Sequence, residues 1–304
     1  MSLIVVCGAT ATGKSDLAIA LAQQFNGEII NADSMQIYRG MDIGTAKLNV
    51  SQRQGIPHHL LDVLNVDQDS TVAWYQSTAR AAIADIKSRG KRAIVVGGTG
   101  LYIKSILDEL NFPDTDPAVR ASLEKELESI GLNALFERLE KLDPAAAIAI
   151  DRANARRVIR ALEVIEITGK PFTANLPREV STRFPDAVQL GLVMDRPTLD
   201  ERISARVDRM WEQGFLAEVD GLLEAGITNG RTAQLALGYS QLIAFRKGVI
   251  TQDQAREETK RATRQYARRQ ETWFSRDERI KWISTSELRF ESALAHLEKL
   301  DSAQ

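Results

Sequence analysis

The chain of 304 residues is 44% hydrophobic and 26% charged, which predicts a globular protein of about two domains. Its net charge of -2 excludes a uniformly basic nucleic-acid-binding protein, so any such surface must be a local patch. The single cysteine, Cys7, excludes an internal disulfide and a multi-cysteine zinc site. The apolar N-terminal run is too short for a signal peptide, and no later segment is apolar enough to span a bilayer. We therefore expect a cytoplasmic protein with no membrane partner.

The chain begins with a phosphate-binding pattern. Leu3–Cys7 is a short apolar run that predicts a buried parallel strand, and an apolar segment suited to a helix begins at Leu17. Between them, the spacing Gly-x-x-x-x-Gly-Lys-Ser is that of a P-loop, in which backbone amides surround a phosphate. Lys14 adds a positive charge and Ser15 offers a hydroxyl to Mg²⁺. An ordinary glycine-rich turn is the alternative. The candidate phosphate-binding residues are Gly8, Ala9, Thr10, Ala11, Thr12, Gly13, Lys14 and Ser15.

Polar residues also follow two later predicted strands. The segment 27–34 predicts a strand that contains Ile29 and Ile30, and Asp33 lies just past the carboxyl end of that strand. Thr99 lies in a glycine-rich turn after the strand 93–96. In an open parallel sheet, the carboxyl ends of the strands form the ligand-binding edge, so both residues belong beside the P-loop. The alternative for Asp33 is a helix cap or turn residue, and the alternative for Thr99 is a glycine-rich turn with no role in binding. The strand 93–96 lacks the terminal aspartate of a motor ATPase or GTPase switch.

The segments between these strands have different characters. Residues 35–47 are irregular and predict a functional loop, whereas 72–87 predicts an amphipathic helix and 101–110 another helix. The adjacent histidines His58 and His59 do not complete a metal-binding pattern, because neighbours along a strand point in opposite directions.

A cluster of helix-breaking residues at 112–117 predicts a domain boundary. The sequence thus predicts an α/β fold, a P-loop NTPase-like parallel sheet flanked by helices, formed by residues 1–112 and 187–304. Residues 113–186 are predicted to form a helical insertion domain. On one helix of the insertion, four arginines would form a basic edge, although a solvated face offset by glutamates explains them equally well. These arginines are Arg152, Arg156, Arg157 and Arg160.

The α/β pattern resumes with a strand at 189–194, and two basic helices follow. Arg202, Arg206 and Arg209 share one helix face, from which they could reach a phosphate or pair with neighbouring acidic residues. The last long helix predicted, 254–276, mixes basic and aromatic residues, as RNA-binding surfaces do. A solvated helix with its aromatic residues in the core is the alternative.

Six motifs in order resemble the tRNA dimethylallyltransferase family. They lie at 8–15, 33–39, 42–47, 58–62, 97–102 and 156–163. The resemblance covers nearly the whole chain. It implies transfer of a dimethylallyl group from dimethylallyl diphosphate to N6 of adenine 37 in tRNAs reading codons that begin with U, with release of diphosphate. We also expect a monomer.

The resemblance also implies roles for the residues at the sheet edge. Asp33 would accept the proton of the poorly nucleophilic adenine amine, with Thr99 as a hydrogen-bonding neighbour. The P-loop, Lys14 and a Mg²⁺ cofactor near Ser15 would stabilise the departing diphosphate. Arg206 is a further candidate for binding the diphosphate. Asp33, Thr99 and Lys14 are thus the candidate catalytic residues.

Because the adenine must leave its stacked loop, the family resemblance also implies a surface that grips the tRNA anticodon stem-loop. The residues assigned to it are Asp33, Ser34, Met35, Gln36, Thr99, Arg120, Arg156, Arg157, Val158, Ile159 and Arg160. Three positions depart from the family pattern, namely Arg156 for glutamine, Ser240 for arginine and Leu48 for proline.

Three other functions are compatible with parts of the sequence. An adenylate isopentenyltransferase would share Lys14, Asp33 and Thr99 but would have less use for the helical insertion. A P-loop nucleotide kinase would transfer phosphate from ATP. A non-catalytic, nucleotide-dependent RNA-binding protein would use the same basic segments without chemistry.

Overall fold

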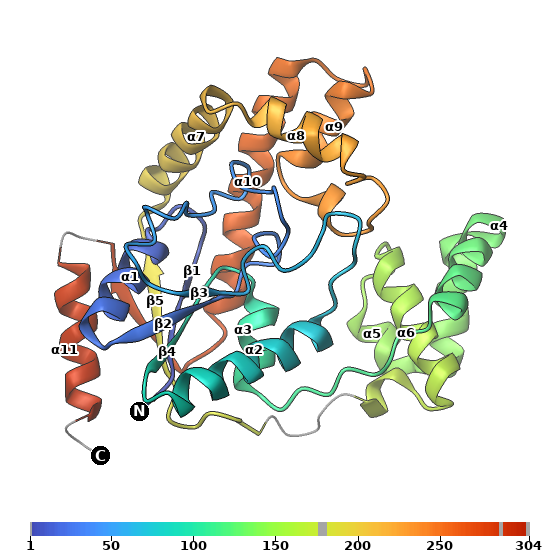
Figure 1. The fold of residues 1–304 in the computed structure, drawn as a ribbon. Coiled ribbons are helices and arrows are strands. Elements are labelled where there is room, and N and C mark those ends of the chain that lie inside the picture. Colours follow the sequence, from blue (N-terminus) through green and yellow to red (C-terminus); the bar gives the residue numbers. More distant parts are fainter. Residues whose placement is uncertain (1, 176–180, 286–287, 302–304) are drawn as a thin grey trace. The chain divides into compact units, whose positions relative to one another are not determined.

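The computed structural model describes residues 2–175, 181–285 and 288–301 (Figure 1). The chain divides into two compact units: Met1–Leu107 with Phe184–Gln304, and Asp108–Arg183. The sequence places these boundaries at 113 and 186. The second unit starts earlier because its two connecting segments pair with each other: Asp108 and Thr182 form an antiparallel bridge, and the Ser181 carbonyl accepts a 2.9 Å hydrogen bond from the Glu109 amide.

The first unit contains a parallel sheet, whose six described strands lie in the order β3-β2-β4-β1-β5-β6. The two central strands, β4 and β1, are nearly continuous apolar runs, as expected where a sheet is covered on both faces. The strands are β1 Ile4–Gly8, β2 Gly27–Asn31, β3 His58–His59, β4 Arg92–Val96, β5 Val188–Val193 and β6 Ile280–Ser284. The strand β6 was not predicted from the sequence.

Helices follow the strands in the α/β pattern (Figure 1). Those of the first unit are α1 Lys14–Gln24, α2 Val72–Ser88, α3 Gly100–Leu107, α7 Arg196–Glu212, α8 Phe215–Glu224, α9 Tyr239–Arg246, α10 Gln252–Phe274 and α11 Arg289–Asp301, with a short 3₁₀ helix at Ala233–Leu235. Helix α3 ends at Leu107, earlier than the sequence predicts, and α11 was not predicted.

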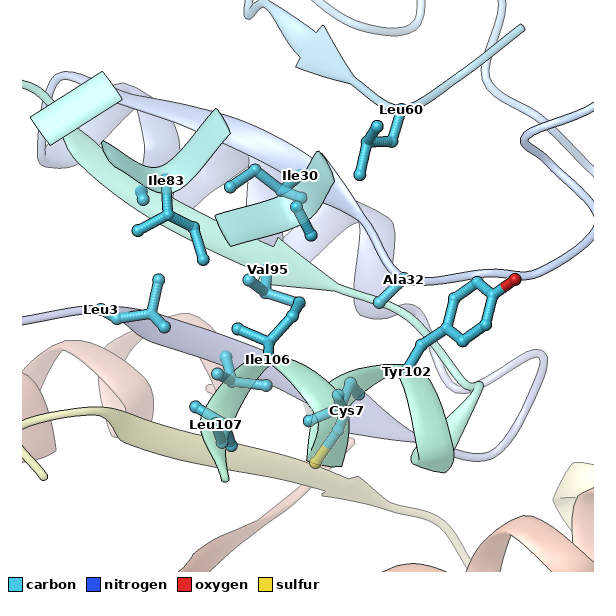
Figure 2. Close-up of a cluster of buried hydrophobic side chains, with 14 of the residues drawn as sticks. Leu3, Cys7, Ile30, Ala32, Leu60, Ile83, Val95, Tyr102, Ile106 and Leu107 are labelled. Carbon is cyan, nitrogen blue, oxygen red and sulfur yellow. The ribbon is translucent and has the colours of Figure 1, made fainter. Parts of the chain in front are cut away.

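Alternate side chains of β1 and of Leu3, the residue before it, enter two separate hydrophobic clusters, because neighbours along a strand point to opposite faces of the sheet. Leu3 and Cys7 pack with α2 and α3 residues such as Ile83 and Ile106 (Figure 2). Ile4 and Val6 join the cluster on the other face, which includes residues of α1 and α11. Burial raises the pKa of the Cys7 thiol to about 12, which agrees with a structural rather than reactive cysteine.

The register of the sheet brings the predicted site segments together. Asn31 of β2 and Val6 of β1 both pair with Val96 of β4, so the three strands end at neighbouring positions. Adjacent strands lie about 4.8 Å apart. The segments that follow these strands, which carry Asp33, Thr99 and the P-loop, therefore meet at one edge of the sheet.

The second unit is helical and has its own hydrophobic cluster. Its helices are α4 Pro117–Leu142, α5 Pro144–Ala149 and α6 Ala155–Thr168, followed by a 3₁₀ helix at Phe172–Asn175. The predicted row of arginines on one helix is partly wrong. Helix α6 begins only at Ala155, because the Asn154 side chain caps it by accepting a hydrogen bond from the Arg157 amide. Arg152 precedes the helix and lies over the Phe136 ring.

Candidate active site

The P-loop joins β1 to α1 through two glycines with positive φ. Gly8 has a φ of 132°, and a Cβ there would lie 2.6 Å from the Leu192 carbonyl oxygen, so the position requires glycine. Gly13 has a φ of 88° at the N-cap of α1 and offers no side chain to cap the helix. The first amides of α1 are therefore left to bind an anion, as the P-loop pattern predicts.

Lys14 extends its ammonium group over this loop. Its Nζ donates a 2.6 Å hydrogen bond to the Ala9 carbonyl oxygen, which also accepts a hydrogen bond from the Thr12 hydroxyl. Burial, with the nearby charge of Arg206, lowers the pKa of Lys14 to about 8. A bound anion would stabilise the charged form of this side chain.

Arg206 of α7 lies between the P-loop and the irregular loop after β2. Its guanidinium group donates hydrogen bonds of 3.2 Å each to the Thr10 hydroxyl and to the Thr45 carbonyl. Burial lowers the pKa of Arg206, which indicates a guanidinium held in a partly dry environment. The structure thus brings Arg206, Lys14 and the P-loop together, as the sequence proposes for a diphosphate site.

Gln270 of α10 connects the P-loop to the glycine-rich turn after β4. Its Oε1 accepts a 2.9 Å hydrogen bond from the Thr10 amide, and its Nε2 donates a 2.8 Å hydrogen bond to the Gly98 carbonyl. A Cβ at Gly98 would lie 2.1 Å from that Nε2. Sequence reasoning missed Gln270, because one glutamine on a long basic helix carries no signal of its own.

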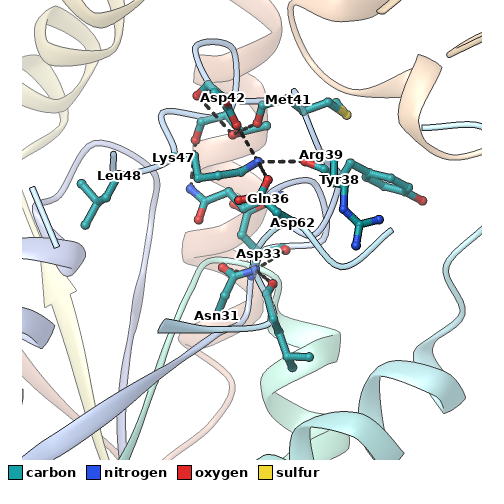
Figure 3. Close-up of polar contacts among 12 residues, drawn as sticks. Asn31, Asp33, Gln36, Tyr38, Arg39, Met41, Asp42, Lys47, Leu48 and Asp62 are labelled. Carbon is teal, nitrogen blue, oxygen red and sulfur yellow. Dashed lines mark hydrogen bonds and ion pairs between the residues drawn. The ribbon is translucent and has the colours of Figure 1, made fainter. Parts of the chain in front are cut away.

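Asp33 follows β2 in a turn that its own side chain helps to form. Its Oδ1 accepts a 2.8 Å hydrogen bond from the Met35 amide. Its backbone amide donates to the Asn31 Oδ1 at 3.0 Å (Figure 3). Among the described residues, no hydrogen bond reaches the Asp33 Oδ2. Because Asp33 lines a cavity, this oxygen can accept a proton from a bound group.

Thr99 contacts the residue after Asp33 and not Asp33 itself. The Thr99 hydroxyl accepts a 3.1 Å hydrogen bond from the Ser34 amide and lies 3.4 Å from the Ser34 hydroxyl. This contact needs the glycine at 97, where a Cβ would lie 2.2 Å from the Ala32 carbonyl oxygen. Thr99 therefore orients the turn that carries Asp33.

A cavity of about 280 Å³ opens beside these groups. Its lining includes three of the residues assigned to RNA, Asp33, Ser34 and Met35. Its other polar residues are Thr10, Thr45, Arg206, Thr259, Thr263, Tyr266 and Arg269, and the remaining lining residues are Gly44, Ile203, Val207, Met210, Leu235, Ala236, Leu237 and Tyr239. A cavity with an unpaired carboxylate, a cation and an apolar wall can hold a substrate that is charged at one end and hydrocarbon at the other.

Tyr266 is a further lining residue that sequence reasoning did not assign to the site. Burial and the nearby Asp33 charge raise its pKa to about 12, so it stays a neutral hydrogen-bonding group. Gln36, by contrast, is engaged within its own loop, since its Nε2 donates a 3.1 Å hydrogen bond to the Thr45 carbonyl.

The residues assigned to RNA in the second unit differ in their surroundings. Arg120 and Arg160 both pair with Glu163, whose side chain is completely buried. Burial opposes ionisation of Glu163, but the two guanidinium groups hold its pKa below the usual value. Arg160 also donates to the Pro113 carbonyl at 2.6 Å. These two arginines stabilise the helical unit, whatever else they bind.

The assignment of Val158 and Ile159 to RNA contact is corrected by the structure. Both side chains are buried in the hydrophobic cluster of the second unit, where RNA cannot reach them. Arg156 and Arg157 are exposed on the same helix. No ion pair joins either arginine to another described residue.

Comparison with known proteins gives the family. The sequence profile described as IPP transferase matches residues 36–277. The chain belongs to the IPP transferase family. A protein of Thermobifida fusca named tRNA dimethylallyltransferase is 57% identical over 93% of this chain and 89% of its own length. Its namesake from Streptomyces griseus is 55% identical over 92% of this chain and 89% of its own length.

Two solved structures are also similar to this chain. A eukaryotic dimethylallyltransferase described as acting on tRNA has a TM-score of 0.81 at 31% identity, covering 94% of this chain and 74% of its own. The full-length tRNA isopentenylpyrophosphate transferase of Bacillus halodurans has a TM-score of 0.71 at 37% identity, covering 99% and 96%. These matches confirm the resemblance, the P-loop-like α/β fold and the assignment of the protein as a transferase.

The described parts of the chain, 2–175, 181–285 and 288–301, contain neither a membrane-spanning helix nor a metal-binding cluster of side chains. Within them, no helix is both long and apolar enough to cross a bilayer. The same residues hold no group of three histidine, cysteine or acidic side chains placed to bind a metal ion.

Proposed function

We propose that the protein transfers a dimethylallyl group from dimethylallyl diphosphate to N6 of adenine 37 in tRNAs that read codons beginning with U, releasing diphosphate. The observation that carries the proposal is the cavity, which joins the Asp33 carboxylate and the Arg206 side chain to an apolar wall. The family and its tRNA-modifying relatives supply the reaction class. We also expect a cytoplasmic monomer.

The P-loop and its two cations would bind the diphosphate. Amides at the start of α1, the Lys14 ammonium and the Arg206 guanidinium converge from two elements on this region. They stabilise the negative charge that grows on the leaving group as its bond to carbon breaks. Apolar side chains of the cavity, such as Ile203 and Met210, would pack against the five-carbon chain.

Asp33 would take the proton that the reaction releases. The adenine nitrogen forms a bond to the first carbon of the dimethylallyl group, and the carbon–oxygen bond breaks with its electron pair leaving on the diphosphate. The amine then gives up one proton, for which the Asp33 Oδ2 is a suitable acceptor because Asp33 lines the cavity and no described residue donates a hydrogen bond to this oxygen. Thr99 contributes by fixing the Asp33–Ser34 turn.

Ser15 would hold Mg²⁺ together with oxygens of the substrate. The described residues offer no carboxylate or histidine cluster, but Mg²⁺ commonly keeps several waters and binds through phosphate oxygens. A single hydroxyl next to Lys14 at the start of α1 therefore fits such an ion. When bound, Mg²⁺ supplies additional positive charge to the diphosphate.

The second unit would bind the anticodon stem-loop through its exposed arginines. Arg156 and Arg157 have no ion-pair partner among the described residues, so both charges are available to phosphate groups. The adenine has to leave the stacked loop to reach Asp33, which requires such a grip on the flanking backbone.

One transfer assay tests the proposal. The protein is incubated with labelled dimethylallyl diphosphate, Mg²⁺ and either unmodified tRNA or AMP, and label is counted in each acceptor. We expect label in tRNA only. Label in AMP but not in tRNA would show an adenylate isopentenyltransferase instead. Turnover of ATP alone would indicate a kinase, and RNA binding without label transfer would indicate a non-catalytic binding protein.

A further inference from the structure

The loop 42–47 contributes to the site through its backbone. Gly44 and Thr45 line the cavity. The Thr45 carbonyl accepts a 3.2 Å hydrogen bond from Arg206 and a 3.1 Å hydrogen bond from Gln36. The direction in which the Arg206 guanidinium points therefore depends on where this loop backbone lies.

Lys47 secures the end of the loop from within the protein. Its side chain is only 2% exposed, although it carries a charge. Its ammonium group donates to the Tyr38 carbonyl at 2.8 Å, to the Asp42 carboxylate at 2.7 Å and to the Asp62 carboxylate at 2.6 Å (Figure 3). All three ammonium protons are thus used, and the loop is closed onto itself and onto the segment after β3.

Glu218 of α8, which is negatively charged, holds the start of the loop by accepting hydrogen bonds from its backbone amides. Its Oε2 accepts hydrogen bonds from the amides of Asp42, at 3.1 Å, and Ile43, at 2.6 Å. Its Oε1 accepts from the Gly44 amide at 3.2 Å and from the Tyr239 hydroxyl at 2.6 Å. Three successive amides therefore converge on one carboxylate, an arrangement that holds the backbone in a single conformation.

The packing at Gly44 leaves the loop no room to shift. A Cβ at this position would lie 2.3 Å from the Phe215 ring and 2.5 Å from the Tyr239 ring. Both rings are completely buried, so they cannot move aside without disturbing the core. The loop backbone lies directly against α8 and α9.

We propose that Lys47 and Glu218 are positioning residues for the transfer reaction, an inference that rests on the proposed function. Together they fix the Thr45 carbonyl, which holds the Arg206 guanidinium toward the P-loop. Neither side chain lines the cavity, so both act through Arg206 and not on the substrate. A guanidinium already aimed at the diphosphate needs no reorganisation when charge develops on the leaving group.

Lys47→Met tests the role of the buried ammonium group. We expect the dissociation constant for inorganic pyrophosphate to rise about tenfold and kcat to fall by a similar factor, because Arg206 is no longer held in place. The variant should fold, since Asp42 and Asp62 are 58% and 40% exposed and water can solvate them. Asp42→Asn, which keeps the shape of an exposed partner, should change both constants in the same direction but less.

A double-mutant cycle separates positioning from general stabilisation. If Lys47 and Glu218 act through Arg206, then Lys47→Met and Glu218→Gln should each change pyrophosphate binding less than about twofold in an Arg206→Ala background. Arg246→Met is the matched control, because it removes an exposed ion pair with Asp220 between the same helices, α8 and α9, and should leave binding and kcat unchanged.

Two results would overturn the inference. In the first, both single variants bind pyrophosphate and turn over as the wild type does. In the second, Lys47→Met and Glu218→Gln weaken pyrophosphate binding as much in the Arg206→Ala background as in the wild-type protein. Failure of the proposed function would look different. The wild-type protein would then transfer no label to tRNA, while the pyrophosphate cycle would still report whether Lys47 and Glu218 position Arg206.

Discussion

The two ends of β2 carry carboxylates in opposite situations. At the amino end, the Glu28 side chain is 3% exposed and its oxygens pair with Arg89 at 2.5 and 2.7 Å, Lys91 at 2.7 Å and His59 at 2.8 Å. Beyond the carboxyl end, Asp33 lines a cavity and accepts hydrogen bonds from backbone amides on Oδ1, whereas no described residue donates one to its Oδ2. Only four residues of the chain lie between Glu28, whose two carboxylate oxygens both have partners, and Asp33, which has one oxygen that accepts no hydrogen bond from a described residue.

The difference in partners gives the two carboxylates different roles, because Glu28 stabilises the fold and Asp33 is available for the reaction. Hydrogen bonds from Arg89 hold the pKa of Glu28 well below its usual range, with further hydrogen bonds from Lys91 and His59, so Glu28 cannot take up a proton near neutral pH. Its partners join β2, β3 and the end of α2. No ion pair joins Asp33 to another residue in the part of the chain that the structure describes, and its Oδ2 is available to a bound amine.

The largest effect is expected from Asp33→Ala. Removing the proton acceptor should lower the transfer rate about 10³-fold, within the usual range for a lost general base, while tRNA affinity and the melting temperature stay close to wild type. Asp33→Asn provides the control for loop structure, because its side-chain oxygen can still accept from the Met35 amide. Near-normal turnover in Asp33→Asn would show that the carboxylate is not the base.

Glu28→Gln should affect stability instead. Lys91 would lose its charged partner and Arg89 would keep only Asp85, which should lower the free energy of unfolding at pH 7 by about 3 kcal/mol, with kcat unchanged. Because folding lowers the pKa of Glu28, its contribution is present above the unfolded carboxyl pKa of about 4.3 and is lost as pH falls below that value. Denaturant unfolding of both proteins at pH 7 and in acid checks this. A stability difference that grew in acid would contradict the assignment.

Lys14 should give the site a pH dependence. Its pKa is about 8, so its ammonium is charged below pH 8 and loses the charge as pH rises through that value. Binding of inorganic pyrophosphate should therefore weaken above pH 8, by up to about tenfold for loss of one charge-assisted hydrogen bond. Lys14→Met is the control, since the ionisation of pyrophosphate itself affects both proteins. Identical pH profiles by calorimetry would show that Lys14 does not contribute.

The smallest effect is expected in the second unit, where Arg157 has no ion-pair partner among the described residues and Arg160 pairs with Glu163. Arg157→Ala should weaken tRNA binding a few-fold and reduce the slope of log affinity against log salt by about one, with no change in melting temperature. Arg160→Ala is a matched comparison on the same helix that should lower the melting temperature, because it removes one partner of buried Glu163. Unchanged tRNA affinity in Arg157→Ala would remove this arginine from the RNA surface.

Much of the site could be predicted from local patterns. The P-loop spacing, Asp33 and Thr99 each follow a predicted strand, and parallel strands place their carboxyl ends at one edge. Helix registers were less predictable. Arg152 was wrongly placed on α6, because the Asn154 cap starts the helix after it, and Val158 was assigned to RNA although its helix face is buried.

The sequence by itself determined the α/β fold, the phosphate loop and the identity of the carboxylate at the sheet edge, since these depend on spacing along short stretches of chain. Only the tertiary structure decided which charges are paired. Gln270 reaches the P-loop from 260 residues away, and Glu218 caps a loop more than 170 residues before it. Whether a charged group stabilises the fold or remains free for a substrate depends on such distant partners, because burial and hydrogen bonding are properties of the folded chain.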